Sequence, residues 1–199
     1  MRMLAIETAT EACSVALFEG TELIGRFHEV LGRGHAERLV PMIADLPDKG
    51  RAAQIRVSLG PGSFTGTRIG IAVARSLGIA WGSKVAGFQT LQLVALQAAH
   101  TPALVCMNGG HGEWFVQPFD AACRPLADAA SMAPERAVAE FDQTHVIGSR
   151  AEDFVALRGS GEATHALPDA SHADRLAQDQ LFPSVSPLYG RAPDARKPQ

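Results

Sequence analysis

Short apolar runs separated by turn residues open the chain and predict extended strands. Three lie close together, at residues 3–7, 13–18 and 23–27, and a hairpin turn at residues 19–22 joins the second to the third. Later apolar runs predict five more strands, at residues 54–59, 84–87, 103–107, 113–119 and 146–148.

Helical spacing first appears in residues 36–46, where apolar side chains recur on one face. Pro41 lies inside this pattern and is expected to bend the helix or break it near its first turns. Weaker helical patterns cover residues 90–99, 151–157 and 171–180. Strands joined by tight turns and then alternating with helices predict an α/β fold, in which helices pack on a mixed sheet.

The second strong helical pattern runs from residue 66 or 67 to Trp81. Ser63 or Thr65 is the expected N-cap, because either hydroxyl can accept a hydrogen bond from an unpaired backbone N–H group of the first turn. Gly82 is the expected stop, since glycine adopts the left-handed conformation that ends many helices.

Element order and composition suggest two units, residues 1–100 and a smaller, less regular unit at residues 101–199. The boundary is expected at Thr101-Pro102, and the proline-rich residues 183–199 are expected to run over the surface. No repeat is visible in the sequence.

A glycine-rich segment, Gly60-Pro61-Gly62-Ser63-Phe64-Thr65-Gly66, joins a predicted strand to the second helix. Free backbone N–H groups at a helix start attract anions, and glycines let the backbone approach a phosphate. The candidate anion or nucleotide contacts are Thr8, Gly62, Ser63 and Thr65. No lysine follows as in a P-loop. The alternative is a tight turn whose glycines serve backbone geometry alone.

Small residues recur every fourth position along the second helix, at Gly66, Gly70, Ala74 and Gly78. A glycine inside a helix costs roughly 1 kcal/mol relative to alanine, so several in one register need a compensating contact. A close backbone would provide one. It could belong to residues 36–46 of the same chain or to a partner protein, and the pattern leaves both open.

Charge and cysteine content narrow the class of protein. The net charge is −3 and the pI about 6.1, so a protein that holds nucleic acid by its own electrostatics is disfavoured, and any role with nucleic acid is expected to be indirect. Three scattered cysteines without C-x-x-C spacing favour a reducing compartment. No signal peptide and no run long enough to cross a bilayer are recognisable, so we expect a cytoplasmic protein.

The sequence contains no convincing catalytic constellation. No two of the seven histidines are three or four residues apart, so one helix cannot offer a paired-histidine metal site, and we expect no metal. The Gly-x-Ser-x-Gly motif is absent, and the cysteines are expected to be buried structural thiols. We therefore expect no enzymatic activity from this chain alone.

Several motifs along the chain together match the pattern of one known family. They are Leu4-Ala5-Ile6-Glu7-Thr8-Ala9-Thr10 with Cys13-Ser14-Val15-Ala16-Leu17, His35 with Leu39-Val40-Pro41-Met42-Ile43, the glycine segment extended to Thr67-Arg68-Ile69-Gly70, and Pro187-Leu188-Tyr189-Gly190-Arg191 followed by Pro193-Asp194-Ala195. These motifs resemble the TsaB (YeaZ) family, which belongs to the glycoprotease-like proteins. The likeness is strong over residues 3–100 and thin up to about residue 183.

This resemblance implies an actin/Hsp70-like (ASKHA, ribonuclease H-like) fold of two lobes, with the second lobe reduced. It implies a non-catalytic scaffold or activator subunit that dimerises with the enzyme TsaD. Together with the ATPase TsaE, that pair transfers threonylcarbamoyl to the tRNA adenosine next to the anticodon. A homodimer is expected when TsaD is absent. No cofactor is expected in this subunit, with ATP or ADP held at most weakly or at the complex interface.

The resemblance also places the partner interface on the first two helices. The residues concerned are His35, Leu39, Ile43, Gly66, Ile69, Gly70, Val73, Ala74 and Leu77. A leucine at position 70 or 74 is accordingly expected to abolish dimerisation and to leave the fold mostly intact.

Two departures from the family pattern weaken specific inferences. Glu7 stands where the family commonly has Asp, a position that lies near metal and phosphates in ASKHA kinases, so nucleotide binding is in doubt. Residues 106–113 also differ from the family's turn at that place. The alternatives are a glycoprotease-like hydrolase and a nucleotide-binding regulatory ASKHA module.

Overall fold

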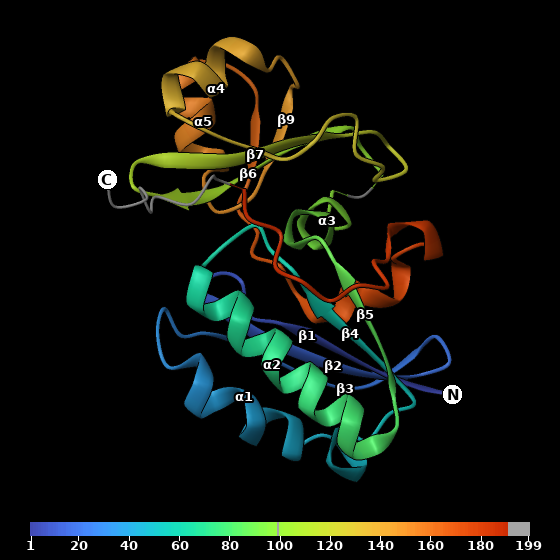
Figure 1. Cartoon of the computed structure of the whole chain (residues 1–199). Coiled ribbons are helices and arrows are strands. Elements are labelled where there is room, and N and C mark those ends of the chain that lie inside the picture. The colour runs from blue at the N-terminus through green and yellow to red at the C-terminus, as the bar shows by residue number, and fades with distance from the viewer. Residues whose placement is uncertain (99, 191–199) are drawn as a thin grey trace.

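The computed structural model describes residues 1–98 and 100–190 of the 199-residue chain. Its framework is two five-stranded mixed sheets (Figure 1). The first sheet has the order β3-β2-β1-β4-β5 and consists of β1 (Arg2–Glu7), β2 (Ala12–Glu19), β3 (Glu22–Val30), β4 (Gln54–Ser58) and β5 (Lys84–Phe88). The second has the order β10-β9-β6-β7-β8 and consists of β6 (Ala103–Gly110), β7 (Glu113–Phe119), β8 (Ala130–Met132), β9 (His145–Ile147) and β10 (Glu162–Thr164).

Five α-helices and three short 3₁₀ segments connect or cover these strands in the described residues. The helices are α1 (His35–Ala44), α2 (Phe64–Trp81), α3 (Thr90–Ala95), α4 (Pro134–Glu140) and α5 (Ala151–Arg158). The 3₁₀ segments are η1 (Pro47–Gly50), η2 (Ala170–Arg175) and η3 (Gln178–Gln180).

The two sheets have the same strand connectivity. β1, β2 and β3 form an antiparallel meander, and β4 and β5 then add parallel to β1 after α1 and α2. β6, β7 and β8 repeat the meander, and β9 and β10 add parallel to β6 after α4 and α5. The fold is therefore a structural repeat that the sequence does not reveal, and the second copy has the shorter helices and, except for β6, the shorter strands.

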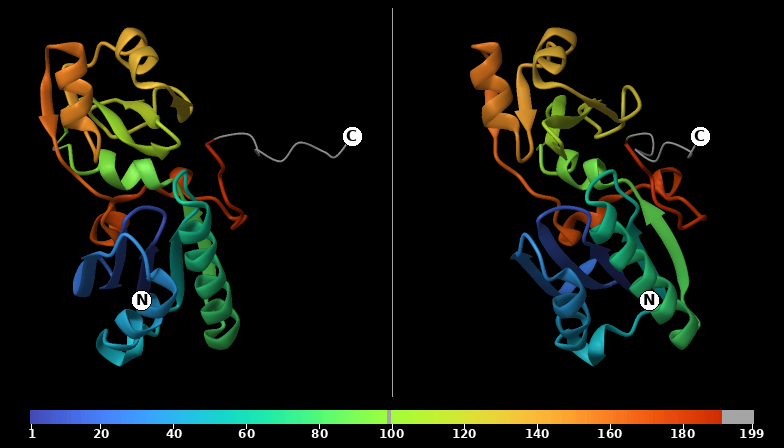
Figure 2. Two further views of the ribbon diagram at one scale, coloured as in Figure 1. Left: turned by 90° about the vertical axis from the view of Figure 1, so that its left-hand side faces the viewer. Right: turned by 60° about the vertical axis from the view of Figure 1, so that its left-hand side comes forward.

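Alternation along the strands builds three apolar cores. In β1, Leu4 and Ile6 face the core beneath α1 and α2, whereas Met3 and Ala5 face the core shared with α3 and the second sheet. A third core lies between the second sheet and α4 and α5. The molecule is thus layered, with α1 and α2 outside the first sheet, α3 and η2 between the sheets, and α4 and α5 outside the second (Figures 1 and 2).

Most of the expected elements are confirmed, and the glycine segment sets the limits of α2. The helix begins at Phe64, two residues earlier than expected, because the Ser63 hydroxyl accepts a hydrogen bond of 3.2 Å from the Gly66 N–H group. It ends at Gly82, which has a φ of 67° as the expected left-handed stop. Pro41 does not break α1, which continues through it to Ala44.

Other expectations in the second half were wrong in detail. The helix expected at residues 90–99 already ends at Ala95, and residue 99 lies outside the described residues. The helix expected at residues 171–180 is replaced by η2 and η3. The sequence analysis missed α4, β8 and β10, since each has three to seven residues and little apolar periodicity.

The chain returns to the first sheet after β10. Ala170, Ala173 and Leu176 join the core between the sheets. Residues 182–190, which we call the C-terminal strap, then pair with β5 and pass α2. Residues 191–199, including the family-like Arg191 and Pro193-Asp194-Ala195, lie outside the described residues.

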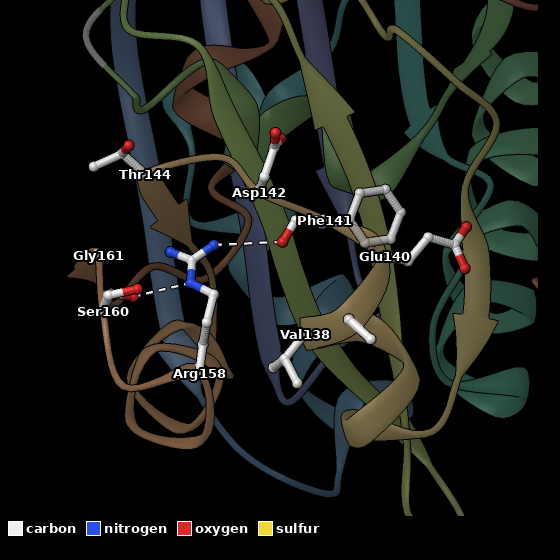
Figure 3. Close-up of a pocket in the computed structure, with 9 residues that line it drawn as sticks. Val138, Glu140, Phe141, Asp142, Thr144, Arg158, Ser160 and Gly161 are labelled. Atoms are coloured by element: carbon white, nitrogen blue, oxygen red, sulfur yellow. Dashed lines mark hydrogen bonds between the residues drawn. The ribbon is translucent and has the colours of Figure 1, made fainter.

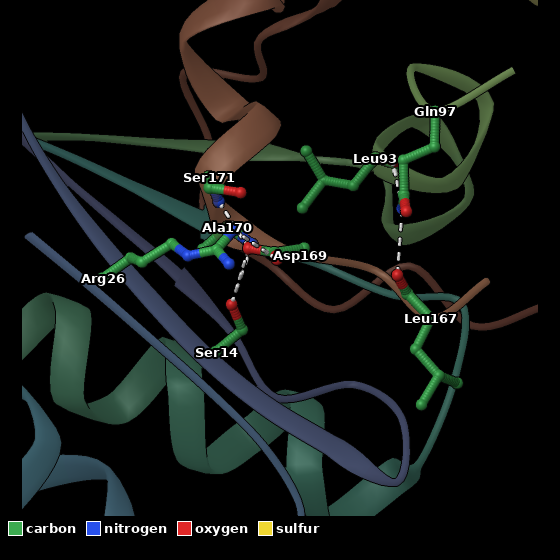
Figure 4. Close-up of polar contacts among 8 residues, drawn as sticks. All are labelled: Ser14, Arg26, Leu93, Gln97, Leu167, Asp169, Ala170 and Ser171. Carbon is green, nitrogen blue, oxygen red and sulfur yellow. Dashed lines mark hydrogen bonds and ion pairs between the residues drawn. The ribbon is translucent and has the colours of Figure 1, made fainter. Parts of the chain in front are cut away.

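A buried polar contact fixes this return (Figure 4). The Ser14 hydroxyl of β2 accepts a 2.9 Å hydrogen bond from the Ala170 N–H group and donates one of 3.3 Å to Asp169. Arg26 forms a 3.6 Å ion pair with the same carboxylate. Burial alone would raise the pKa of Asp169, but hydrogen bonds from Ser171 and nearby positive charges hold it below its usual value.

We expect Ser14→Ala to lower the free energy of unfolding by about 1–2 kcal/mol, because the Ala170 N–H group would lose its acceptor in a buried site. Urea denaturation measures this change. Ser76→Ala is the matched control, because Ser76 is exposed on α2 and its change should leave the transition in place. Equal midpoints for the two variants would contradict a structural role for Ser14.

None of the described helices is long and apolar enough to span a lipid bilayer.

Candidate functional site

The main candidate site is a cavity of about 1180 Å³ between the two lobes. Five parts of the chain form its wall, namely residues 9–11, residues 32–37, the glycine segment with the first turn of α2, residues 108–111 with Phe115, and Tyr189 with Gly190. The first half of the chain supplies most of the wall, and the β6–β7 turn closes it from the second lobe.

An aromatic and cationic cluster lies at this cavity beside the N-terminus of α2. The guanidinium carbon of Arg68 lies 3.6 Å from the centre of the Phe64 ring, and its Nη2 donates a 2.8 Å hydrogen bond to the Tyr189 hydroxyl. The rings of Phe64 and Tyr189 stack with their centroids 5.8 Å apart. Phe64 is 57% exposed and Tyr189 51%, so this cluster stands at the molecular surface.

Sequence reasoning missed this cluster as a site. Arg68 and Tyr189 were noted only as parts of two family-like motifs that lie 121 residues apart in the chain. A signal was present, because Tyr189 is the only tyrosine of the chain and stands in one of those motifs.

The glycine segment is filled by the chain itself. A methyl group at Gly60 would lie 2.8 Å from the Leu188 carbonyl oxygen, and one at Gly62 would lie 2.9 Å from the Ala9 carbonyl carbon. The space that a phosphate would need at these glycines is therefore occupied by the protein backbone. This geometry supports the tight-turn interpretation of the motif.

The four candidate anion contacts do not converge. Thr8 is buried and donates a 2.8 Å hydrogen bond to the Gly66 carbonyl oxygen, so its hydroxyl is used within the fold. Gly62 packs on Ala9, and the Ser63 hydroxyl caps α2. Of the four, Thr65 is exposed without such a structural role, and it lines the cavity beside Ser63.

Glu7 is fully buried at the end of β1. One carboxylate oxygen accepts a 2.5 Å hydrogen bond from the Ala9 N–H group, and the other has no hydrogen-bond partner. Burial raises the pKa of Glu7 to about 7, against the weaker opposing effect of the Ala9 hydrogen bond and of the nearby polar groups of Ser58 and Thr8. The acidic position of β1 thus keeps its proton to a higher pH than an exposed glutamate does.

The small residues of α2 face their own sheet, so the expectation of an open strip for a partner backbone was wrong. A side chain on Gly70 would collide with the Thr8 hydroxyl, and one on Gly66 with the Thr8 carbonyl group. Ala74 is fully buried among the residues of β1 and β4. A leucine at position 70 or 74 therefore tests the core and not a partner surface.

The other expected interface residues divide into buried and half-buried positions. Leu39 and Ile43 belong to the core between α1 and the first sheet. His35 is buried at the start of α1, where its Nε2 lies 3.1 Å from the Ala12 carbonyl oxygen. Ile69, Val73 and Leu77 are half-buried on one flank of α2.

The cysteines of this chain are poor nucleophiles. All three are buried and free, and burial raises the pKa of Cys13 to about 11 and that of Cys106 to about 12. Within residues 1–98 and 100–190, no three His, Cys, Asp or Glu side chains are grouped as a metal site would require.

A second cavity of about 630 Å³ lies between α4 and the residues after α5 (Figure 3). Arg158 crosses it and donates hydrogen bonds of 2.8 and 2.9 Å to the carbonyl oxygens of Gln143 and Ser160. Its guanidinium group therefore links two segments of the second lobe, and the cavity presents no convergent set of free donors.

The fold defines the class of protein. The ethanolamine utilization protein EutJ of Carboxydothermus hydrogenoformans superposes with a TM-score of 0.50 over 88% of each chain, at 9% identity, which is a likeness of fold alone. Two mixed sheets flanked by helices place the chain in the actin/Hsp70-like (ASKHA) class.

The family follows from the sequence comparisons. A family model described as TsaD, tRNA N6-adenosine threonylcarbamoyltransferase, matches residues 25–182. The chain belongs to this family and, within it, to the TsaB (YeaZ) proteins.

The relatives match different shares of the chain. TsaB of Escherichia coli is 40% identical over 100 residues, which cover 48% of this chain and 43% of that protein. TsaB of Bacillus subtilis is 30% identical over 110 residues, 53% of this chain and 48% of that protein. These matches span less than half of the curated TsaB proteins. An uncharacterized protein of Mycobacterium tuberculosis is 37% identical over 98% of this chain and 93% of its own length.

Solved structures agree with this assignment. YeaZ from Pseudomonas aeruginosa superposes with a TM-score of 0.79 at 26% identity, covering 94% of this chain and 99% of that one.

Proposed function

We propose that this chain is a non-catalytic subunit in the biosynthesis of threonylcarbamoyladenosine in tRNA, and that it acts by pairing with a TsaD enzyme through the outer face of α1 and α2. The likeness to proteins named for that pathway is the observation that carries the proposal. The transfer to tRNA would then be the work of TsaD, aided by TsaE, and tRNA would contact this chain only indirectly.

The outer face of α1 and α2 has the composition of a helix-packing surface. The two helices lie side by side against the first sheet (Figure 1). Val40 of α1 is 53% exposed and Ile79 of α2 is 87% exposed. The exposed positions near them include the small residues Ala36, Ala44, Ala72, Ser76 and Ala80, together with Glu37, Pro41 and Arg75. A partner helix can approach the small positions closely and cover the two larger side chains.

The chemistry of the described residues supports a role without catalysis. The thiols are buried and protonated, and the glycine segment is packed by the chain itself. A second copy of the chain is the expected partner when TsaD is absent, since the same apolar face would then remain uncovered.

We expect Val40→Arg to weaken binding to the TsaD protein of the same organism by about tenfold or more, because a charge would be buried at the helix contact. Titration calorimetry of wild type and variant measures the change. Sedimentation tests self-association in the same samples.

Leu126→Arg is the matched control. Leu126 is 61% exposed, comparable to Val40, but it lies between β7 and β8 in the second lobe. Its substitution should leave binding to TsaD unchanged. If wild type does not bind TsaD, or if both variants bind as wild type does, the proposed partner face is wrong.

A further inference from the structure

We propose that the C-terminal strap, residues 182–190, gates the cavity between the lobes: it is anchored at Phe182 and opens from its Tyr189 end. The strap begins at the edge of the first sheet, passes α2 and ends at the cavity wall. In Figure 1 it is part of the red segment that runs between the two lobes.

The anchored end is held by backbone contacts. Phe182 and Gly87 exchange two hydrogen bonds, each of 2.8 Å, so the strap extends the edge of β5 by one antiparallel bridge. Arg75 of α2 donates a hydrogen bond to the Val185 carbonyl oxygen, and the Val185 side chain is buried in the core beneath α2. Opening this end would break ladder hydrogen bonds and expose an apolar side chain.

The other end is held by contacts at the surface. Arg68 is exposed and binds the Tyr189 hydroxyl, and the Tyr189 ring lies against a Phe64 ring that is itself 57% exposed. Hydrogen bonds between exposed groups compete with water, so they hold a segment less firmly than buried ladder bonds do. The Tyr189 end is therefore the weaker of the two, and opening should start there.

Between the ends the strap lies on the glycine segment. The Leu188 N–H group donates a 2.7 Å hydrogen bond to the Leu59 carbonyl oxygen, and the Leu188 carbonyl oxygen lies over Gly60. Gly190 fits between Pro61 and Phe115 of β7, where a methyl group would lie 2.9 Å from the Pro61 Cβ and would collide with the Phe115 ring. The strap thus fills the space where the glycine segment meets the second lobe.

Tyr189 and Gly190 line the cavity, so release of Tyr189 would open a path from the cavity to Gly60 under the strap. Thr67 lies beneath the strap at this place, because a methyl group at Gly60 would contact both the Leu188 carbonyl oxygen and the Thr67 hydroxyl. Thr67 is 4% exposed while the strap is in place. A ligand or partner segment that enters the cavity as far as Gly60 must therefore displace the strap first.

Amide exchange followed by NMR tests the direction of opening. In Tyr189→Ala, we expect the Leu188 N–H group to exchange about tenfold faster or more, because the Tyr189 contacts that fix this end of the strap are removed. The Gly87 N–H group, which is bonded to Phe182, should exchange as in wild type. Equal acceleration of both amides, or of neither, would overturn the proposal.

A thiol probe tests the gating itself. In a Thr67→Cys background, adding Tyr189→Ala should raise the rate of reaction with methyl methanethiosulfonate by about tenfold or more. The native cysteines give a low background, since burial raises the pKa of all three. An unchanged rate would show that the strap does not cover Thr67, and the proposed gate would be wrong.

Ser186→Ala is the matched control for both experiments. Ser186 is exposed on the strap between the anchored and the releasable contacts, so its change should alter neither rate. If Ser186→Ala accelerates both readouts as strongly as Tyr189→Ala, the Tyr189 contacts have no special part in holding the strap. Amide exchange needs no introduced cysteine and gives the result if Thr67→Cys does not fold.

Discussion

Glu7→Gln should make the protein more stable at pH 8, by up to roughly 3 kcal/mol, while changing its stability little at pH 4.5. Glu7 is fully buried, and its folded-state pKa of about 7 lies above the ordinary value of 4.5. A glutamine keeps an oxygen for the Ala9 N–H group and carries no charge at any pH.

The direction of this pH dependence follows from whether the folded or the unfolded state binds the Glu7 proton more tightly. Because burial raises the pKa of Glu7, the folded state keeps the proton between pH 4.5 and about 7 while the unfolded state releases it. The contribution of Glu7 to stability is therefore fully present below pH 4.5 and is lost as the pH rises through about 7. In the glutamine variant this loss is absent, so the difference in the free energy of unfolding between variant and wild type increases with rising pH.

Urea denaturation at several pH values between 4.5 and 8 measures the effect. Glu22→Gln is the control, because Glu22 is exposed on β3 and its removal should keep the wild-type pH dependence. A glutamine variant whose stability falls with pH as steeply as that of the wild type would refute the assignment of a raised pKa to Glu7.

The first half of the fold could be predicted from sequence because its signals are strong and local. The strands β1 and β2 alternate between two cores, and α2 has both an N-cap serine and a C-terminal glycine. Parts of the second half resisted prediction because the strands β8 and β10 have three residues each. Three residues are too few to show alternation, so β8 depends on pairing with β7 and β10 on pairing with β9.

The candidate site was harder to predict than the fold because it depends on distant contacts. Tyr189 meets Arg68, and Leu188 covers Gly60, across more than a hundred residues of sequence. The amino-acid sequence of the glycine segment is compatible both with a loop that binds a ligand and with a loop against which the rest of the chain packs. The periodicity of Gly66, Gly70 and Ala74 likewise indicated that a backbone or side chain comes close, but it could not indicate that β1 supplies the neighbour.

Gly70→Leu should lower the free energy of unfolding by roughly 2–4 kcal/mol. The added side chain would start where the Thr8 hydroxyl now lies, and its first carbon would be 3.5 Å from Val57 and 3.7 Å from Ile6. Thr8 would have to move and give up its 2.8 Å hydrogen bond to the Gly66 carbonyl oxygen. The gain in helix propensity, about 1 kcal/mol, offsets only part of this cost.

Ala72→Leu on the same helix is the control that separates the sheet-facing side of α2 from its outer face. Ala72 is exposed two residues after Gly70, so a leucine there should change stability by no more than about 0.5 kcal/mol. Its effect should fall instead on binding to TsaD, since Ala72 lies on the proposed partner face. Urea denaturation measures the stability of both variants, and calorimetry measures their binding to TsaD. If Gly70→Leu is as stable as wild type and Ala72→Leu is not, the orientation of α2 on the first sheet is wrong, and the partner face must be sought on the other side of the helix.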